Sequence, residues 1–574
     1  MPKLPSPILP LLLLLIISIG NAAADAGEPW QEVVSTSPVP PSPPSGEWQL
    51  LHANIGVSAM HMQLLPGDFV LMFDRTDTGP SNLSLSALSP CASSTSGGAA
   101  ADCTAHSVLL DLRSNALHPY PLATNPWCSS GALLPNGTLL QTGGFGADGD
   151  RVARLFTPAT GWTELPSFLA ARRWYATDAI LPDGRVLVLG GRRQFNFEFF
   201  PHVNGEPPAV TFFPFLEETT EVDAEDNLYP FLHLLPDGTV FVFANDRAVV
   251  FDPYNRAPLR RLPPVPGGVP RNYPSSGSSV LLPFRAADAT TTSVEVLVCG
   301  GAPRGAYRLA LRNATFLPAD RTCARVAPAE PDPAWALEEM PTARVMGDMV
   351  LLPTGDVLIV NGAGAGTAGW ELGREPVTRP VLYRPGAPLG SRFEALAATA
   401  TPRMYHSAAT LDTYGRVLVG GSNPHVGYAF GANVTFPTDL SLQAFLPPYL
   451  DPRLDPARPR ILAAPAEVGY GEATAVRFEV LGGVSGVEGE GTGEVRVAAV
   501  APGFATHSLG MNQRVVELAV GRVAQLAVGV YEAEVAAPPT PGVAPPGYYL
   551  WFVVHAGVPS SAAWVRVRPL GPAT

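Results

Sequence analysis

A tyrosine and a histidine stand next to each other at Tyr405 and His406, in the stretch "RMYHSAATLDTYGRVLVGGSN". Neighbouring side chains of a strand point to opposite faces, so both can reach one metal ion only where the chain bends or a strand begins. The pair is therefore either two ligands of a metal, or an aromatic residue in water and a polar neighbour at the rim of a sheet. Other residues of the chain are needed to distinguish these two interpretations.

An unpaired cysteine is the second chemical signal. The chain has five cysteines. In an oxidising compartment we expect two short-range disulfides, Cys91–Cys103 and Cys299–Cys323. With this pairing, Cys128 has no disulfide partner in the chain. Cys128 is then either a buried, inert thiol or a residue with a partner chain or some other covalent fate.

The start of the chain and its composition predict the compartment and exclude some partners. "MPKLPSPILPLLLLLIISIGNAAADAG" predicts a secretory signal peptide over residues 1–24, and no later segment is apolar and long enough for a membrane anchor. The formal charge of -13 argues against a nucleic-acid groove. We therefore expect a secreted, extracellular protein that acts as a monomer. Four N-x-S/T sequons fit secretion, at Asn82, Asn136, Asn313 and Asn433.

One phrase recurs seven times along the chain: an apolar strand, a turn that usually contains Gly, and a second apolar strand. Asn-Gly and Asp-Gly turns supply the positive φ angles of tight hairpins, and a lone four-stranded blade cannot bury both of its faces. The copies lie about 45 to 70 residues apart, the range of kelch-type blades. They begin at Leu64, Ala132, Ile180, Leu234, Val280, Leu351 and Thr410. The pattern predicts a seven-bladed kelch-type β-propeller over residues 45–445, with a degenerate fifth copy.

The pattern changes after the proline-rich stretch "LPPYLDPRLDPARPRILAAP". Short alternating strands follow, such as "AVRFEV", "GEVRVAAV" and "YYLWFVVHA". Their spacing predicts an immunoglobulin-like β-sandwich over residues 455–574. The whole fold is therefore expected to be all-β.

The segment before the inner strand pair of each repeat should reach the mouth of the propeller channel, where binding sites usually lie. Reading these segments places Tyr175, Tyr229, Tyr273 and Tyr405 at related positions, with Cys128 and His406 among them. Tyrosines at such positions most often only pack. His507, in "APGFATHSLGMNQR", is a further candidate that on its own reads as an exposed loop residue.

Several motifs together resemble the galactose oxidase and glyoxal oxidase family of copper-radical oxidases. They are "NPWCSSG", "RRWYAT", "PRMYHSAATL", "FLPPYL", "PGFATHS" and "PGYYLWFV". The resemblance covers almost all of the chain after the signal peptide, keeps the motif order, and is closest to the glyoxal oxidase-like aldehyde oxidases of plants. It implies that the C-terminal sandwich is of the early-set type and that secretion leads to the cell wall or apoplast if the source is a plant.

The resemblance also implies a role for each candidate residue. Tyr175 matches the tyrosine that becomes the radical, and Cys128 matches the cysteine joined to its ring by a thioether bond. His406 and His507 match the two imidazole ligands of one copper ion, and Tyr405 matches the axial tyrosine. Nitrogen and oxygen ligands in a tetragonal array suit Cu(II).

The implied reaction converts a small aldehyde to a carboxylic acid and reduces O2 to hydrogen peroxide, with Tyr405 as general base. A primary-alcohol oxidase like galactose oxidase would share the ligand set, so the motifs do not separate the two. A non-catalytic secreted kelch scaffold or carbohydrate-binding protein would need neither Cys128 nor the Tyr405-His406 pair. A glycosidase would need paired carboxylates at the channel, and the sequence shows no recognisable pair.

Positions in the repeat suggest further residues around the site. Arg271, Arg344 and Tyr229 could line a substrate pocket, and Trp127 and Trp174 could shield the radical because they flank Cys128 and Tyr175. Packing or surface roles explain each of these residues equally well.

Overall fold

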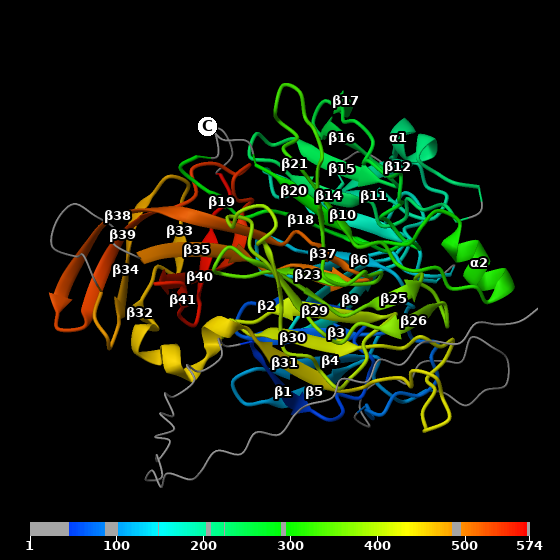
Figure 1. Ribbon diagram of the computed structural model, residues 1–574, viewed down its shortest axis with the longest axis horizontal. Helices are drawn as coiled ribbons and strands as arrows, with labels where there is room; N and C mark the ends of the chain where they lie inside the picture. Colours follow the sequence, from blue (N-terminus) through cyan, green and yellow to red (C-terminus); the bar gives the residue numbers. More distant parts are fainter. Residues whose placement is uncertain are drawn as a thin grey trace, which may run out of the picture. The chain divides into compact units, whose positions relative to one another are not determined.

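The computed structural model describes residues 45–85, 102–146, 148–202, 208–222, 224–288, 294–484 and 495–570 (Figure 1). The predicted signal peptide and Cys91 lie outside these residues. Within them, seven sheets contribute the four-stranded blades of a propeller, and a β-sandwich follows. Both predicted folds are confirmed.

The first four blades follow one another along the chain, each running from its innermost to its outermost strand. Blade one consists of β2 (His61–Leu65), β3 (Phe69–Phe73), β4 (Ser107–Asp111) and β5 (Ala116–Tyr120); blade two of β6 (Ser130–Leu133), β7 (Leu139–Thr142), β8 (Ala153–Thr157) and β9 (Gly161–Leu165); blade three of β10 (Ala176–Ile180), β11 (Val186–Gly190), β12 (Asn196–Phe200) and β13 (Thr211–Phe212); and blade four of β14 (Phe231–Leu234), β15 (Val240–Ala244), β16 (Arg247–Asp252) and β17 (Ala257–Arg261). The second strands are apolar on both faces because neighbouring blades cover both: every residue of β11 is buried.

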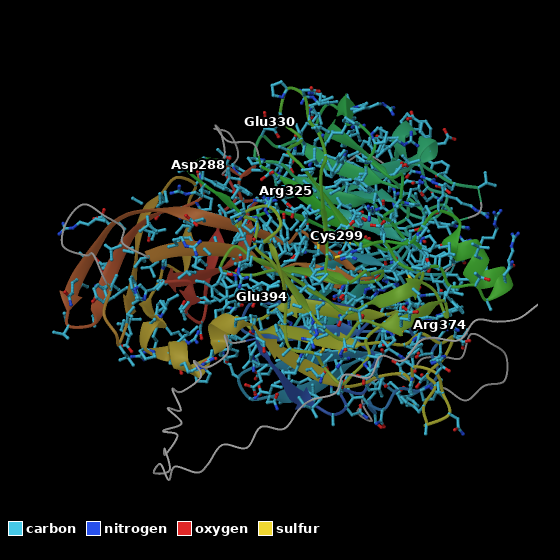
Figure 2. All side chains as sticks on the ribbon, viewed as in Figure 1. Asp288, Cys299, Arg325, Glu330, Arg374 and Glu394 are labelled. Atoms are coloured by element: carbon cyan, nitrogen blue, oxygen red, sulfur yellow. A yellow bond between two sulfur atoms is a disulfide. The ribbon has the colours of Figure 1, made fainter. Side chains whose placement is uncertain are left out.

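The later blades carry the insertions. Blade five consists of β18 (Ser278–Leu281), β20 (Val296–Cys299), β21 (Thr322–Val326) and β22 (Ala336–Glu339), and blade six of β23 (Asp348–Leu351), β24 (Val357–Val360), β27 (Val381–Tyr383) and β28 (Phe393–Ala395). The fifth copy is degenerate because its turn contains β19 (Phe284–Arg285), which pairs with a sandwich strand. The long insertion in blade six forms a separate hairpin of β25 (Ala363–Gly366) and β26 (Gly373–Pro376), on which Figure 2 labels Arg374. Two short helices, α1 (Pro214–Glu218) and α2 (Ala306–Asn313), lie in connecting segments.

Blade seven closes the ring with the first strand of the described chain. It consists of β29 (Ser407–Leu411), β30 (Val417–Gly421), β31 (Leu442–Leu446) and, outermost, β1 (Glu47–His52). Strands β1 and β31 pair in antiparallel register, with Trp48 opposite Phe445. The ring is therefore fastened by hydrogen bonds between its two ends, which the repeat pattern did not predict.

The sandwich has its own core around Trp551, Phe478 and Val497. Its strands are β32 (Arg460–Ala463), β33 (Glu467–Val468), β34 (Ala473–Glu479), β35 (Val495–Ala501), β38 (Arg514–Ala527), β39 (Val530–Ala536), β40 (Gly547–His555), β41 (Val558–Pro559) and β42 (Ala563–Val567). The short 3-10 helices η1 (Pro448–Leu450) and η2 (Pro452–Ala457) connect it to the propeller. In the described part of the chain, no helix has both the length and the apolar character needed to cross a membrane.

The disulfide predicted between Cys299 and Cys323 is present, and it joins directly opposite residues of β20 and β21 in blade five (Figure 2). Cys103 is disulfide-bonded as well, while its predicted partner Cys91 lies outside the described residues. Cys128 is the free cysteine of the described chain and is buried. The four sequon asparagines are all exposed, so each is accessible to the modification that the sequence predicts.

Candidate metal centre

Three of the predicted site residues occupy the same structural position in different blades. Cys128, Tyr175 and His406 each lie in the bend just before an innermost strand, with φ angles of 54°, 66° and 63°. The backbone N–H of Tyr175 donates to the carbonyl of Cys128 at 2.9 Å, so adjacent bends are fastened laterally around the channel. The left-handed bend at His406 lets the neighbouring residues Tyr405 and His406 face one place, as the sequence argument required.

His507 comes from the C-terminal part of the chain. It lies in the turn between β36 (Phe504–Thr506) and β37 (Leu509–Met511), a hairpin that pairs with β2 and contacts the innermost strands of several blades. Figure 1 shows β37 among β6, β18 and β23 at the centre of the propeller. The Nε2 atom of His507 lies 3.1 Å from the Cys128 Sγ atom, although the two residues are 379 positions apart in the sequence. Its Nδ1 atom is held 2.6 Å from the Thr506 hydroxyl.

The structure thus brings together the five residues predicted to hold copper or form the thioether bond. The rings of Tyr405 and His406 stack at 3.9 Å, and those of His406 and His507 lie edge to face at 4.9 Å. The ring of Tyr175 lies 6.1 Å from that of His507. Each of these side chains is buried. The five residues come from three blades and one inserted hairpin, so only the closed propeller assembles them.

A third tyrosine links the two phenols. The Tyr175 hydroxyl donates to the Tyr273 oxygen at 3.2 Å, and the oxygens of Tyr273 and Tyr405 are 3.0 Å apart. The ring of Tyr273 also stacks on that of Tyr175 at 4.5 Å. The repeat placed Tyr273 at a related position, but sequence reasoning gave it no role at the site. Tyr229 packs beside it, with its ring 5.1 Å from His507 and its hydroxyl bonded to the Ser129 carbonyl.

Burial keeps these groups uncharged in the metal-free protein. It raises the pKa of the Cys128 thiol and of the Tyr175 and Tyr405 phenols well above their ordinary ranges. It lowers the pKa of His406 and of His507 well below the usual value for imidazole. Neutral imidazoles are the form that binds metals.

The unsatisfied atoms of His406 test whether a metal fits. Both ring nitrogens of His406 are buried, and neither has a hydrogen-bond partner in the described part of the chain. Such a group costs about 1–3 kcal/mol for each polar atom left without a partner. One ligand atom each from Cys128, His406 and His507 lies within 4.8 Å of the others. Sulfur and imidazole donors beside two phenols suit copper, so the residues present fit the ion that the sequence predicts.

An aromatic wall surrounds the cluster. The Trp174 ring lies 4.8 Å from that of Tyr175 and 5.1 Å from that of Trp127. Trp370, from the hairpin inserted in blade six, stacks on Trp127 at 5.1 Å. The Arg75 guanidinium lies 4.2 Å from the centre of the Trp127 ring. The insertion therefore completes this wall, a role for which the sequence held no signal beyond its length.

The expectation that Arg271 and Arg344 line a substrate pocket is wrong. Both are buried, and each donates to a backbone carbonyl that follows the second strand of its blade, those of Gly300 and Asn361. Arg403 in blade seven donates in the same way to the Gly421 carbonyl at 2.7 Å. These arginines join the bend before the first strand to the end of the second, which is a structural role.

The fold and the cluster define a class: a propeller in which a buried group of thiol, phenol and imidazole side chains could hold a metal ion. The chain belongs to the glyoxal oxidase family. The family model "Glyoxal oxidase N-terminus" matches residues 60–449, and "Galactose oxidase-like, Early set domain" matches residues 458–567.

Two relatives agree with this assignment, and a solved structure shares the fold. The chain is 42% identical to aldehyde oxidase GLOX1 of Arabidopsis thaliana over 91% of this chain and 84% of that protein. It is 44% identical to aldehyde oxidase GLOX of Vitis pseudoreticulata over 91% of this chain and 97% of that protein. A fungal alcohol oxidase of the AA5 family, solved in complex with copper, shares the fold, with a TM-score of 0.68 at 17% identity over 91% of this chain and all of that one.

Proposed function

We propose that this chain is a secreted, monomeric, copper-dependent aldehyde oxidase that converts the hydrates of small aldehydes to carboxylic acids. Hydrate and O2 give acid and hydrogen peroxide, so two electrons and two protons move from carbon to oxygen. The observation that carries the proposal is the pair of buried, unpartnered His406 nitrogens beside Cys128, His507 and two phenols. Relatives named aldehyde oxidases support the substrate class.

The cluster would hold copper through His406, His507, Tyr175 and Tyr405. A bound copper ion would supply one-electron redox chemistry. The Tyr175 ring would take up the second electron of the oxidation, and O2 would receive both. A thioether bond from the Cys128 sulfur to that ring would spread the unpaired electron over sulfur and lower the potential of the radical. Formation of the bond breaks one S–H and one C–H bond and transfers both hydrogens to O2.

Tyr405 would accept the hydroxyl proton of the substrate as general base. Its oxygen already lies 3.0 Å from that of Tyr273, so the proton has a hydrogen-bonded neighbour to which it can pass. Tyr405 is buried and Tyr273 is half-buried, which limits the water that would compete for the same proton. The stacked wall of Trp127, Trp174 and Trp370 would shield the radical from solvent.

Peroxide release from copper-loaded protein tests the proposal, with glyoxal and methylglyoxal as aldehydes and galactose as a primary alcohol. We expect peroxide from the aldehydes, and a loss of at least about a thousandfold in Tyr175→Phe and Cys128→Ser. Tyr449→Phe is the matched control, because Tyr449 is buried and bonded to the Gly415 carbonyl away from the cluster. Peroxide from galactose alone would instead favour an alcohol oxidase.

Mass spectrometry of peptides from the same protein tests the radical site. A Cys128–Tyr175 peptide pair lighter by two hydrogens and resistant to reductant is the expected result. Full activity of Tyr175→Phe would contradict the radical mechanism. A free Cys128 thiol in copper-loaded protein that releases no peroxide would leave a non-catalytic scaffold as the better explanation.

A further inference from the structure

A hollow of about 520 Å³ has Trp174, the neighbour of Tyr175 in the cluster, in its lining. It is lined by Phe145, Asp150, Arg172, Trp174, Arg192 and Arg193, from segments of blades two and three. The rings of Phe145 and Trp174 lie 4.7 Å apart and form an aromatic floor. Because the Trp174 ring also lies 4.8 Å from that of Tyr175, one indole separates the hollow from the reaction centre.

The rim of the hollow carries three arginines although the chain as a whole carries a formal charge of -13. Arg172 is paired with Asp150 at 3.3 Å, and Arg192 with Glu225 at 3.1 Å. The Arg192 guanidinium lies 5.2 Å from the centre of the Trp174 ring. Arg172 and Arg192 are thus each paired with a carboxylate.

Arg193 is the third arginine of the rim. Its backbone N–H lies 3.3 Å from the Glu225 carboxylate, but its guanidinium has no ion pair or hydrogen bond to any residue in the described ranges. The side chain is exposed, and its φ angle of 58° fixes the turn from which it projects. An unpaired guanidinium beside an aromatic floor is suited to bind a carboxylate, because its planar fork matches the two oxygens.

We propose that this hollow binds the carboxylate end of the substrate, so that the enzyme prefers aldehydes that carry a carboxylate several bonds away from the reacting carbon. The proposal rests on the proposed aldehyde oxidase function. The Trp174 indole lies between the part of the hollow that contains Arg193 and the cluster. A substrate with its aldehyde carbon at the cluster and its carboxylate at Arg193 must therefore have a linking chain that passes this ring. The apolar part of that chain packs on Phe145 and Trp174.

The ratio of two KM values measures this preference. The substrates are 4-oxobutanoate and its methyl ester, which share a carbon skeleton and differ in charge. We expect a lower KM for the acid in the unmodified enzyme, and a ratio of ester KM to acid KM that falls about three- to fivefold in Arg193→Gln, the size of an exposed charge pair. High salt should reduce the ratio as well, since it screens exposed charges.

Arg256→Gln is the matched control. Arg256 is an exposed arginine with a φ angle of 55° in the turn between β16 and β17, away from the hollow. It should keep the original KM ratio. Equal KM values for acid and ester in the unmodified enzyme, or an unchanged ratio in Arg193→Gln, would overturn the proposal.

Calorimetric titration of the copper-free protein with succinate separates this proposal from the oxidase function. Succinate has two carboxylates and no aldehyde, and its binding needs no chemistry. We expect binding that is weakened in Arg193→Gln and kept in Arg256→Gln. If that result is obtained and no aldehyde is oxidised, the oxidase function fails and the carboxylate site stands. If aldehydes are oxidised but succinate binds the Arg193 variant equally well, the carboxylate site fails.

Discussion

Copper should stabilise this fold, because its ligands exist together only in the folded chain. His507 lies 379 positions from Cys128 in the sequence, and His406 comes from another blade. An ion that binds the native but not the unfolded state adds about 2.7 kcal/mol at a free concentration of one hundred times Kd. The change from His507 to Gln removes one imidazole and should remove most of this stabilisation.

The magnitude of the thermal shift follows from chain length. For 574 residues at roughly 2.1 cal/mol/K each, the unfolding entropy is about 1.2 kcal/mol/K. A gain of about 2.7 kcal/mol then raises Tm by about 2 °C, and each further tenfold increase in free copper adds about 1 °C. The slope of Tm against the logarithm of copper concentration is therefore the quantity to measure.

Differential scanning calorimetry over a series of buffered copper concentrations gives that slope, and elemental analysis gives the copper content. His233→Gln is the control, because His233 is buried in blade four and bonded to the Ser279 hydroxyl at 2.8 Å, outside the cluster. We expect His233→Gln to lower Tm but keep the slope and one copper per chain. A His507→Gln variant with the original slope and copper content would refute the assignment of His507 as a ligand.

Three further changes test the fold and its coupling to the site. Burial raises the pKa of Asp178 to about 7, so the stability that this group contributes is present below pH 4 and is lost as pH rises through 7. Between pH 4 and pH 8, the free energy of unfolding of Asp178→Asn in urea should therefore rise by about 2–4 kcal/mol relative to that of the unmodified protein. Parallel pH curves for the two proteins would contradict this. Trp48→Ala should cost about 2 kcal/mol because it loosens the strand that closes the ring, whereas Leu50→Ala on the same strand, 58% exposed, should change the free energy of unfolding by less than about 0.5 kcal/mol. Gly131→Ala would place a Cβ atom 2.5 Å from the Phe504 ring and displace the hairpin that carries His507. Elemental analysis of this variant should therefore show less copper per chain. Full copper content would mean that the hairpin tolerates the shift.

Local sequence patterns predicted the blades because each repeated pattern has the length of one hairpin in the structure. Two apolar runs joined by a turn with glycine form one hairpin, and seven such hairpins define the ring. The closing strand was missed because "EWQLLH" precedes the first repeat and pairs with β31 at the other end of the propeller, at Leu442–Leu446. Nothing in six residues specifies a partner so far away in the chain.

The part of the site that contains unusual residues could be predicted from the sequence. The odd Cys128 and the adjacent Tyr405-His406 pair were visible, and resemblance connected them to Tyr175 and His507. Tyr273 was placed in the repeat but given no role, since many channel tyrosines only pack. The arginines misled because their position in the repeat suggested a substrate pocket, while their partners are backbone carbonyls that the sequence does not display.

The backbone at the site explains why the cluster can exist. Residues with a side chain cost about 1–3 kcal/mol in the left-handed region that glycine enters freely. Yet Cys128, Tyr175, Tyr229, His406 and His507 all adopt φ angles between 44° and 66°. Part of the cost is offset by lateral hydrogen bonds, such as that from the Tyr229 N–H to the Tyr175 carbonyl at 3.0 Å. Glycine would serve the backbone equally well at these bends but would supply no thiol, phenol or imidazole. The same left-handed bend recurs at Ser276 and Met346, before the innermost strands of blades five and six, so the bend belongs to the blade architecture. At Cys128, Tyr175 and His406 this bend holds a thiol, a phenol and an imidazole close together, and this arrangement supports the proposed metal site.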